Sequence, residues 1–172
     1  SVSAVNNSAD DIIKSIYPYP GSGCVIIYES QSFMEGSHIY ALAVDETGQT
    51  QSGWPISISD LSGDQYYESS ALAGSGIFVS FKDNSSENYD VYGQHIAFDG
   101  TLIEPSGLSI SVDNDDQQSS TVAYSQEQDE VLICYEVQDG PETDIFCNEI
   151  NLSNQSVDEP IVISDNISNQ KN

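Results

Sequence analysis

The amino-acid sequence predicts an all-β fold of the β-propeller type, with three four-stranded antiparallel blades and one extra strand at the N-terminus. Three observations carry this prediction: a repeat of about 53 residues, four strand-like segments in each repeat, and turn-forming residues between the segments. Short segments that are rich in Val, Ile, Tyr and Phe and alternate between apolar and polar residues are typical of strands. Four such strands in a repeat of this length are typical of a propeller blade.

The repeat is clearest in the third segment of each copy, where three similar phrases align: HIYALAVDETGQ from His38, DVYGQHIAFDGT from Asp90 and DIFCNEINLSNQ from Asp144. An apolar run precedes each phrase and predicts the second strand: CVIIYE, IFVSFK and VLICYE. A short alternating run follows each phrase and predicts the fourth strand: PISISD, LSISVD and IVISD. The first strands are predicted in DIIKSIYPYP, ESSALAGS and SSTVAYSQ.

Turn-forming residues separate these segments. Examples are Gly21-Ser22-Gly23, Asp99-Gly100 and Asp139-Gly140-Pro141. Gly, Pro, Asn and Asp favour turns because they tolerate or preset the backbone angles that turns need. For Asp99-Gly100 we expect a two-residue hairpin turn with positive φ at both positions.

The repeat divides residues 1–172 into parts of one repeat domain. The blade-like repeats are predicted at 7–60, 61–113 and 114–165, with an orphan strand at 1–6 and a tail at 166–172. Three blades do not close an ordinary propeller, which has about four to eight. Either the chain is a fragment of a longer propeller, or other subunits complete it. In the second case an N-terminal assembly strand would be added to a neighbouring copy: Ser1, Val2, Ser3, Ala4 and Val5.

The charge balance is strongly acidic, with 28 Asp plus Glu against 3 Lys plus Arg and a formal net charge of −25. Binding to nucleic acid or to an anionic membrane surface depends on Lys and Arg, so both are excluded as expected partners. No apolar run approaches the length of a membrane span, and no membrane insertion is expected. The same charge favours binding of cations, among them Ca²⁺.

A candidate calcium site lies in the loop sequence DNDD between the second and third repeats. Asp113, Asp115 and Asp116 supply several carboxylates within a few residues, and Ca²⁺ prefers six to eight oxygen ligands. The loop lacks the order of ligands of an EF-hand. The alternative is an acidic face that is solvated and keeps the protein from aggregating.

Two cysteines lie at facing positions of the third repeat. Cys134 is in the predicted second strand and Cys147 in the third, and a hairpin turn near Gly140-Pro141 places them opposite each other. A cross-strand disulfide is therefore expected in an oxidising compartment. Two buried, reduced thiols are the alternative.

The repeated phrases resemble those of bacterial secreted β-propeller-type repeat proteins, whose blades read roughly Asp-Ile-Tyr-Ala-Gln-x-Ile/Val-Asp-x-x-Gly, then Trp, then an Ile-Ser-like strand. DVYGQHIAFDGT followed by GLSIS, and HIYALAVDETGQTQSGWPISIS with Trp54, carry the resemblance over about 160 residues. The third copy departs from it at Cys147 and Asn148. The resemblance implies an extracellular or cell-surface protein that serves as a scaffold, an adhesion module or part of a larger enzyme.

No catalytic motif appears around His38 or His95, and the chain has no arginine with which a sialidase-type site could bind a carboxylate. We therefore expect a non-enzymatic structural or surface-assembly subunit whose partners are other copies or other repeats of the same protein. Two alternatives stay open. One is an adhesion propeller on which exposed Tyr and Trp stack against glycans, and the other is a fragment of a larger secreted propeller protein or hydrolase.

Overall fold

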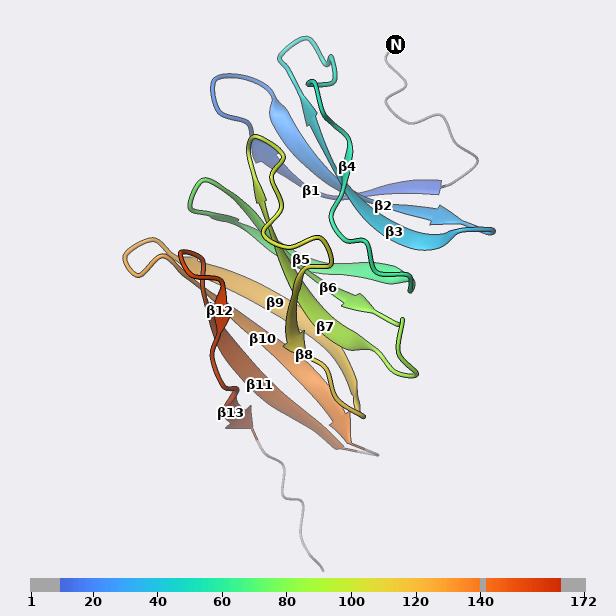
Figure 1. Ribbon diagram of the computed structural model, residues 1–172, viewed down its shortest axis with the longest axis vertical. Helices are drawn as coiled ribbons and strands as arrows, with labels where there is room; N and C mark the ends of the chain where they lie inside the picture. The colour runs from blue at the N-terminus through green and yellow to red at the C-terminus, as the bar shows by residue number, and fades with distance from the viewer. Residues whose placement is uncertain (1–9, 140–141, 165–172) are drawn as a thin grey trace, which may run out of the picture.

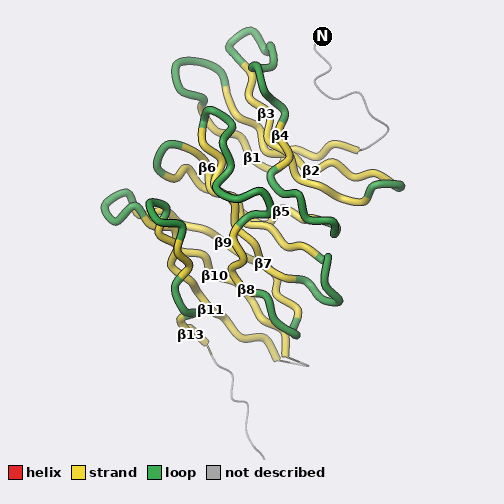
Figure 2. Tube along the Cα trace, viewed as in Figure 1, coloured by secondary structure: helices red, strands yellow, loops and turns green. Residues whose placement is uncertain are grey.

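The computed structural model describes residues 10–139 and 142–164, and in these ranges the chain forms antiparallel β-sheets and no helix (Figure 2). The first sheet contains β1 (Asp10–Pro18), β2 (Cys24–Ser32), β3 (Gly36–Val44) and β4 (Ile56–Ser57). The second contains β5 (Gln65–Ala73), β6 (Gly76–Asp83), β7 (Asp90–Ala97) and β8 (Leu108–Ser111). The third contains β9 (Asp116–Ser125), β10 (Glu130–Asp139), β11 (Glu142–Asn151), β12 (Ser156–Val157) and β13 (Ile161–Ser164).

Strand order follows chain order in the first two sheets, as expected for repeats linked by hairpins. The third sheet differs from the predicted four strands, because β12 and β13 both pair with β11, at different points along it. The other sheets have the same break: Thr50 and Leu102 make isolated bridges before β4 and β8 begin. The fourth strand of each repeat is therefore interrupted by a loop, and its second part is β4, β8 or β13.

Each sheet carries one stacked pair of aromatic rings on its second and third strands. The pairs are Tyr28–Tyr40, Phe81–Tyr92 and Tyr135–Phe146, with ring centroids 5.5, 5.7 and 6.2 Å apart. The two members lie directly opposite each other in every sheet. Facing aromatic side chains on neighbouring strands stabilise a sheet, and this pair fixes the same register in all three repeats.

Each first strand contains a β-bulge beside the same ring of the second strand. The register shifts between Ile13 and Ser15 in β1 and between Tyr67 and Ser69 in β5, so Lys14 and Glu68 are the extra residues. In β9 the shift falls opposite Tyr135, between Cys134 and Glu136. A bulge bends the strand and increases its twist. The first strands are thus bent alike, which the sequence pattern alone does not reveal.

The turn at Asp99-Gly100 differs from the prediction. Gly100 has φ +88°, but Asp99 is not among the residues with positive φ. The N–H of Gly100 donates to the carbonyl of Ala97 at 2.9 Å, and the N–H of Ala97 donates to the carbonyl of Thr101 at 2.9 Å. This is a three-residue loop with glycine at its left-handed position, so only one residue needs positive φ.

The three sheets stack face to face in an open row along the long axis of the molecule (Figure 1). One hydrophobic core fills the space between the first and second sheets and another fills the space between the second and third. The first strands β1, β5 and β9 lie side by side: Ser70 Oγ is 2.9 Å from Ser15 Oγ, and the Val122 N–H donates to Ser69 Oγ at 3.4 Å. The described sheets do not close into a ring.

Candidate assembly surface

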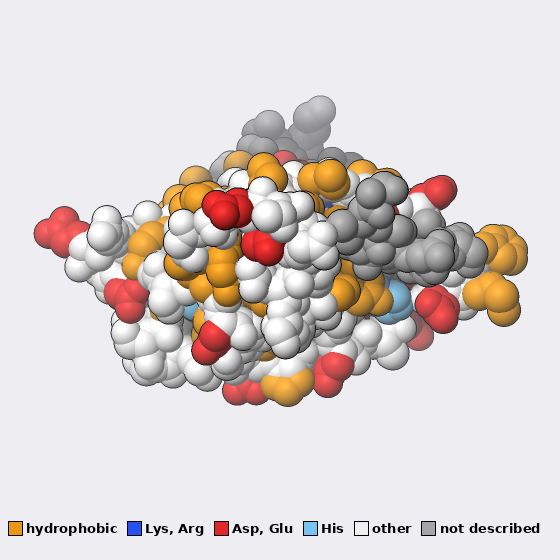
Figure 3. Space-filling model, turned by 90° about the horizontal axis from the view of Figure 1, so that it is seen from above, with side chains coloured by type: hydrophobic (Ala, Val, Ile, Leu, Met, Phe, Trp, Pro, Cys, Tyr) orange, Lys and Arg blue, Asp and Glu red, His pale blue; other side chains and the backbone are white. Residues whose placement is uncertain are grey.

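The outer face of the first sheet, here called the leading face, is apolar and partly open. It is formed by Ile13, Ile16, Ile26, Tyr28 and Leu42. Tyr28 and Leu42 are only 5 % and 6 % exposed, so the open part of the face lies on β1. Ile13 is 70 % exposed and Ile16 is 62 % exposed. Figure 3 views the molecule from the end at which this sheet lies and shows hydrophobic side chains open to solvent between scattered carboxylates.

The equivalent face is covered in the other two sheets. Val79 and Phe81 occupy the positions of Ile26 and Tyr28 in the second sheet, and both are 0 % exposed because they pack against the first sheet. In the third sheet, Ile133 and Tyr135 occupy the same two positions and are 0 % and 3 % exposed.

Tyr28 on the leading face is uncharged at neutral pH. Its burial, the negative charge of Asp11 and the neighbouring Tyr40 raise the pKa of its hydroxyl to about 12.

The outer face of the third sheet, here called the trailing face, is open in the same way. It contains Leu132, Ile145 and Ile163, which are 38 %, 38 % and 59 % exposed. The equivalent residues of the first and second sheets are 0–7 % exposed: Val25 and Phe78, Ile39 and Val91, Ile58 and Ile110. The trailing face, which the repeat buries twice within the chain, is thus left open on the third sheet.

The predicted disulfide lies on the trailing face. Cys134 and Cys147 are directly opposite each other on β10 and β11, and their sulfurs are joined at 2.06 Å. The bond ties together the two central strands of the sheet that carries this face. Cys24, the remaining cysteine, is a free thiol and is partly buried.

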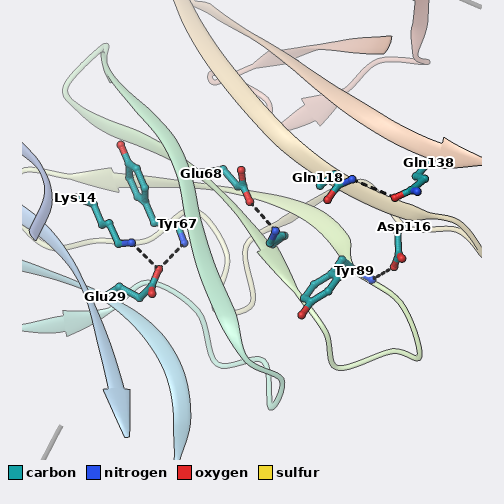
Figure 4. Close-up of polar contacts among 9 residues, drawn as sticks. Lys14, Glu29, Tyr67, Glu68, Tyr89, Asp116, Gln118 and Gln138 are labelled. Atoms are coloured by element: carbon teal, nitrogen blue, oxygen red, sulfur yellow. Dashed lines mark hydrogen bonds and ion pairs between the residues drawn. The ribbon is translucent and has the colours of Figure 1, made fainter. Parts of the chain in front are cut away.

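Carboxylates link each sheet to the next through backbone N–H groups (Figure 4). Glu29 Oε2 accepts a hydrogen bond from the N–H of Tyr67 at 3.2 Å. The same oxygen forms an ion pair with Lys14 Nζ at 3.3 Å. Asp116 Oδ1 accepts the N–H of Tyr89 at 3.0 Å. Tyr67 lies on β5, an edge strand of the second sheet, and Tyr89 lies in the loop before β7. The carboxylates satisfy these two N–H groups and thereby link the sheets.

The Asp116 contact has an equivalent between the first two sheets, where Asp64 Oδ1 accepts the N–H of Ser37 at 2.9 Å. Sequence reasoning did not find this role. Its signal is the Asp-Gln pair that begins the first strand in both repeats, Asp64-Gln65 and Asp116-Gln117. The glutamine of each pair is 0 % exposed, and its amide donates to the loop before it.

The structure does not gather the three aspartates predicted to bind calcium. In residues 10–139 and 142–164, no group of three or more His, Cys, Asp or Glu side chains is placed to hold a metal ion. Asp113 Oδ1 instead accepts the N–H of Asp115 at 2.9 Å and the Nε2 of Gln117 at 2.5 Å. Asp116 turns towards the second sheet, so closeness along the chain does not become closeness of the carboxylates.

The predicted assembly strand, Ser1–Val5, lies outside the described residues. Within the part of the chain that the structure describes, no helix is long and apolar enough to cross a membrane. Neither a protein-family model nor a curated protein matches the sequence.

Proposed function

We propose that this protein is a non-enzymatic structural subunit that assembles outside the cell, the leading face of one copy packing against the trailing face of another. The observation that carries the proposal is the internal repeat of this interface: the positions of Leu132, Ile145 and Ile163 are buried between sheets one and two and between sheets two and three but are open on the third sheet. At the other end of the row, Ile13 and Ile16 are left open on the first sheet. A second copy carries the complementary face, with the same spacing of strands.

Two copies joined in this way bring together six sheets, which lies within the four to eight blades of ordinary propellers. If the second pair of faces also meets, a closed dimer results, and if it does not, an open row of copies grows. The closed dimer covers both apolar faces of each copy, and the open row covers both faces of every copy except those at its two ends. Extended apolar surface on a soluble protein is typical of an interaction site.

The disulfide supports an extracellular location for this assembly. The Cys134–Cys147 disulfide is the kind of bond that persists in oxidising compartments. A glycan-binding role is supported less well, because Trp54 is only 9 % exposed and cannot offer an open ring face to a sugar. The rings of the three stacked pairs likewise face each other.

Sedimentation velocity of two charged variants tests the proposal. Ile13→Asp blocks the leading face and Ile163→Asp blocks the trailing face, and each alone should shift the wild-type assembly towards monomer. Mixing the two variants leaves one compatible pair of faces, so we expect a one-to-one heterodimer that grows no further. Val112→Asp is the matched control, because Val112 is 53 % exposed but lies between β8 and β9, on neither face.

A wild-type chain that stays monomeric at high concentration would refute the proposal, as would assembly that neither face variant weakens. Exchange of the N-terminal strand is a second route for joining copies. Deletion of Ser1–Val5 separates the two routes: assembly through the faces survives the deletion, and assembly through strand addition does not.

A further inference from the structure

Three polar side chains stand in one row across the middle sheet. Gln65 on β5 is directly opposite Asp83 on β6, and Asp83 is directly opposite Asp90 on β7. Directly opposed residues of antiparallel strands project from the same face, with their Cβ atoms about 5 Å apart. The three residues are 0 %, 1 % and 2 % exposed, so the row is closed to bulk solvent.

One oxygen of each side chain has no hydrogen-bond partner: Gln65 Oε1, Asp83 Oδ2 and Asp90 Oδ1. The other polar atoms of these side chains are occupied. Gln65 Nε2 donates to the carbonyl of Leu61 at 3.2 Å, Asp83 Oδ1 accepts from Ser85, and Asp90 Oδ2 accepts from Ser86 Oγ at 2.8 Å. Three buried acceptors are thus left over on one face of the sheet, and a buried acceptor without a donor is costly.

The described cationic side chains do not balance this charge. Lys82, next to Asp83, projects from the opposite face, where its Nζ lies 3.3 Å from Glu68 Oε1 and over the rings of Tyr66 and Tyr89. Lys14 is paired with Glu29 in the first sheet. Burial raises the pKa of Asp90, the Ser86 hydroxyl opposes that rise, and the nearby charge of Asp113 adds to it. Two facing buried carboxylates without a counter-charge are costly, and either a cation from solution or a shared proton relieves that cost.

We propose that Gln65, Asp83 and Asp90 bind a hard divalent cation, of which Ca²⁺ is the best match. The ligands are two carboxylates and one amide oxygen, and Ca²⁺ accepts such oxygen ligands together with water in flexible geometry. Zinc and copper are poorer matches because the row offers no nitrogen or sulfur. The bound ion ties the β6–β7 hairpin to the start of β5.

The site belongs to the middle sheet and is no requirement of the repeat. The equivalent row is Asp11, Ser30 and His38 in the first sheet and Gln117, Val137 and Asp144 in the third. Of these three rows, only that of the middle sheet has carboxylates on both its second and its third strand. The ion therefore binds within one repeat, independently of whether copies assemble.

Isothermal titration with CaCl₂ in about 0.15 M NaCl tests the proposal, since this salt screens weak binding to the acidic surface. We expect one ion per chain for the wild type and a higher melting temperature with Ca²⁺ than with EDTA. Asp83→Asn and Asp90→Asn should each weaken binding at least tenfold while the chain stays folded, because an amide has nearly the shape of the carboxylate. Asp99→Asn, in the exposed β7–β8 turn, is the matched control and should bind as the wild type does.

Two results would overturn the site. The first is binding to Asp83→Asn and Asp90→Asn as tight as to the wild type, which would place the ion on the acidic surface. The second is a wild type that neither binds millimolar Ca²⁺ nor is stabilised by it, but is stabilised by acidification. In that case Asp83→Asn and Asp90→Asn should both lose the stabilisation by acid. That result would show that the facing carboxylates share a proton instead.

Discussion

The same substitution at three equivalent positions measures how far each face is covered. Ile58, directly after β4, and its equivalents Ile110 in β8 and Ile163 in β13 are 0 %, 7 % and 59 % exposed. Replacing isoleucine by alanine removes the same atoms each time. Differences in the free energy of unfolding therefore report the surroundings and not the chemistry of the side chain.

The expected magnitudes follow from burial. Loss of three buried carbons costs roughly 2.4 kcal/mol in transfer free energy, at about 0.8 kcal/mol for each. A residual cavity adds to this, so Ile58→Ala and Ile110→Ala should each cost about 3 kcal/mol, within the usual range of about 2–5 kcal/mol. Ile163 has less than half of its side chain buried, and Ile163→Ala should cost roughly 1 kcal/mol in the monomer.

Urea unfolding, followed by the fluorescence of Trp54 and by circular dichroism, supplies the assay. Measurements at low protein concentration, with the monomer verified by light scattering, report the single chain. At assembling concentrations Ile163→Ala should become more costly, because the second copy covers this position. A monomer in which Ile163→Ala costs as much as Ile58→Ala would refute the view that the trailing face is open.

Three shorter predictions concern positions within the sheets. Gly93→Ala should destabilise the protein by about 1–3 kcal/mol in urea unfolding, because the added Cβ would lie 2.4 Å from Phe78 Cζ. Replacing Cys134 and Cys147 by serine together should cost about 2–3 kcal/mol, since the bond closes a loop of 13 residues, and dithiothreitol should lower the melting temperature of the wild type alone. Hydrogen bonds from Thr47 and Gln49 lower the pKa of Asp45 in the folded protein. The ionised Asp45 therefore stabilises the fold above its unfolded-state pKa, and this stabilisation is lost as the pH falls through its folded-state pKa. Asp45→Ala should destabilise the protein at pH 7 and have no effect on its stability at pH 2.

The sequence predicts the all-β class and the three repeats because the information is local. Alternation, turn residues and the facing cysteines each depend on a few neighbouring residues, and the strand pairs that they imply are antiparallel neighbours in the chain. The bulges at Lys14 and Glu68 are hidden, because a polar residue inside an alternating strand looks the same with or without a bulge. Closure into a propeller is not local and depends on surfaces that meet between sheets.

The acidic residues show the same limit more sharply. Asp113, Asp115 and Asp116 are close in sequence, yet their carboxylates serve separate loop and interface contacts. Asp83 and Asp90 are seven positions apart and face each other only because the β6–β7 hairpin closes between them. Strand register decides which acidic residues lie close together. Neither the composition nor a short motif predicts the register of three neighbouring strands.

The large negative charge must act against assembly, and this gives a last prediction. Each copy carries a formal net charge of −25, so two copies repel each other as their faces approach. The Debye length falls from about 10 Å at 0.1 M salt to about 3 Å at 1 M, which removes most of this repulsion while leaving apolar contact intact. Sedimentation velocity should therefore show stronger self-association as NaCl is raised from 0.05 to 1 M, while Ile13→Asp stays largely monomeric across the series. Association that weakens with salt would mean that charge pairing, and not the apolar leading and trailing faces, holds the copies together.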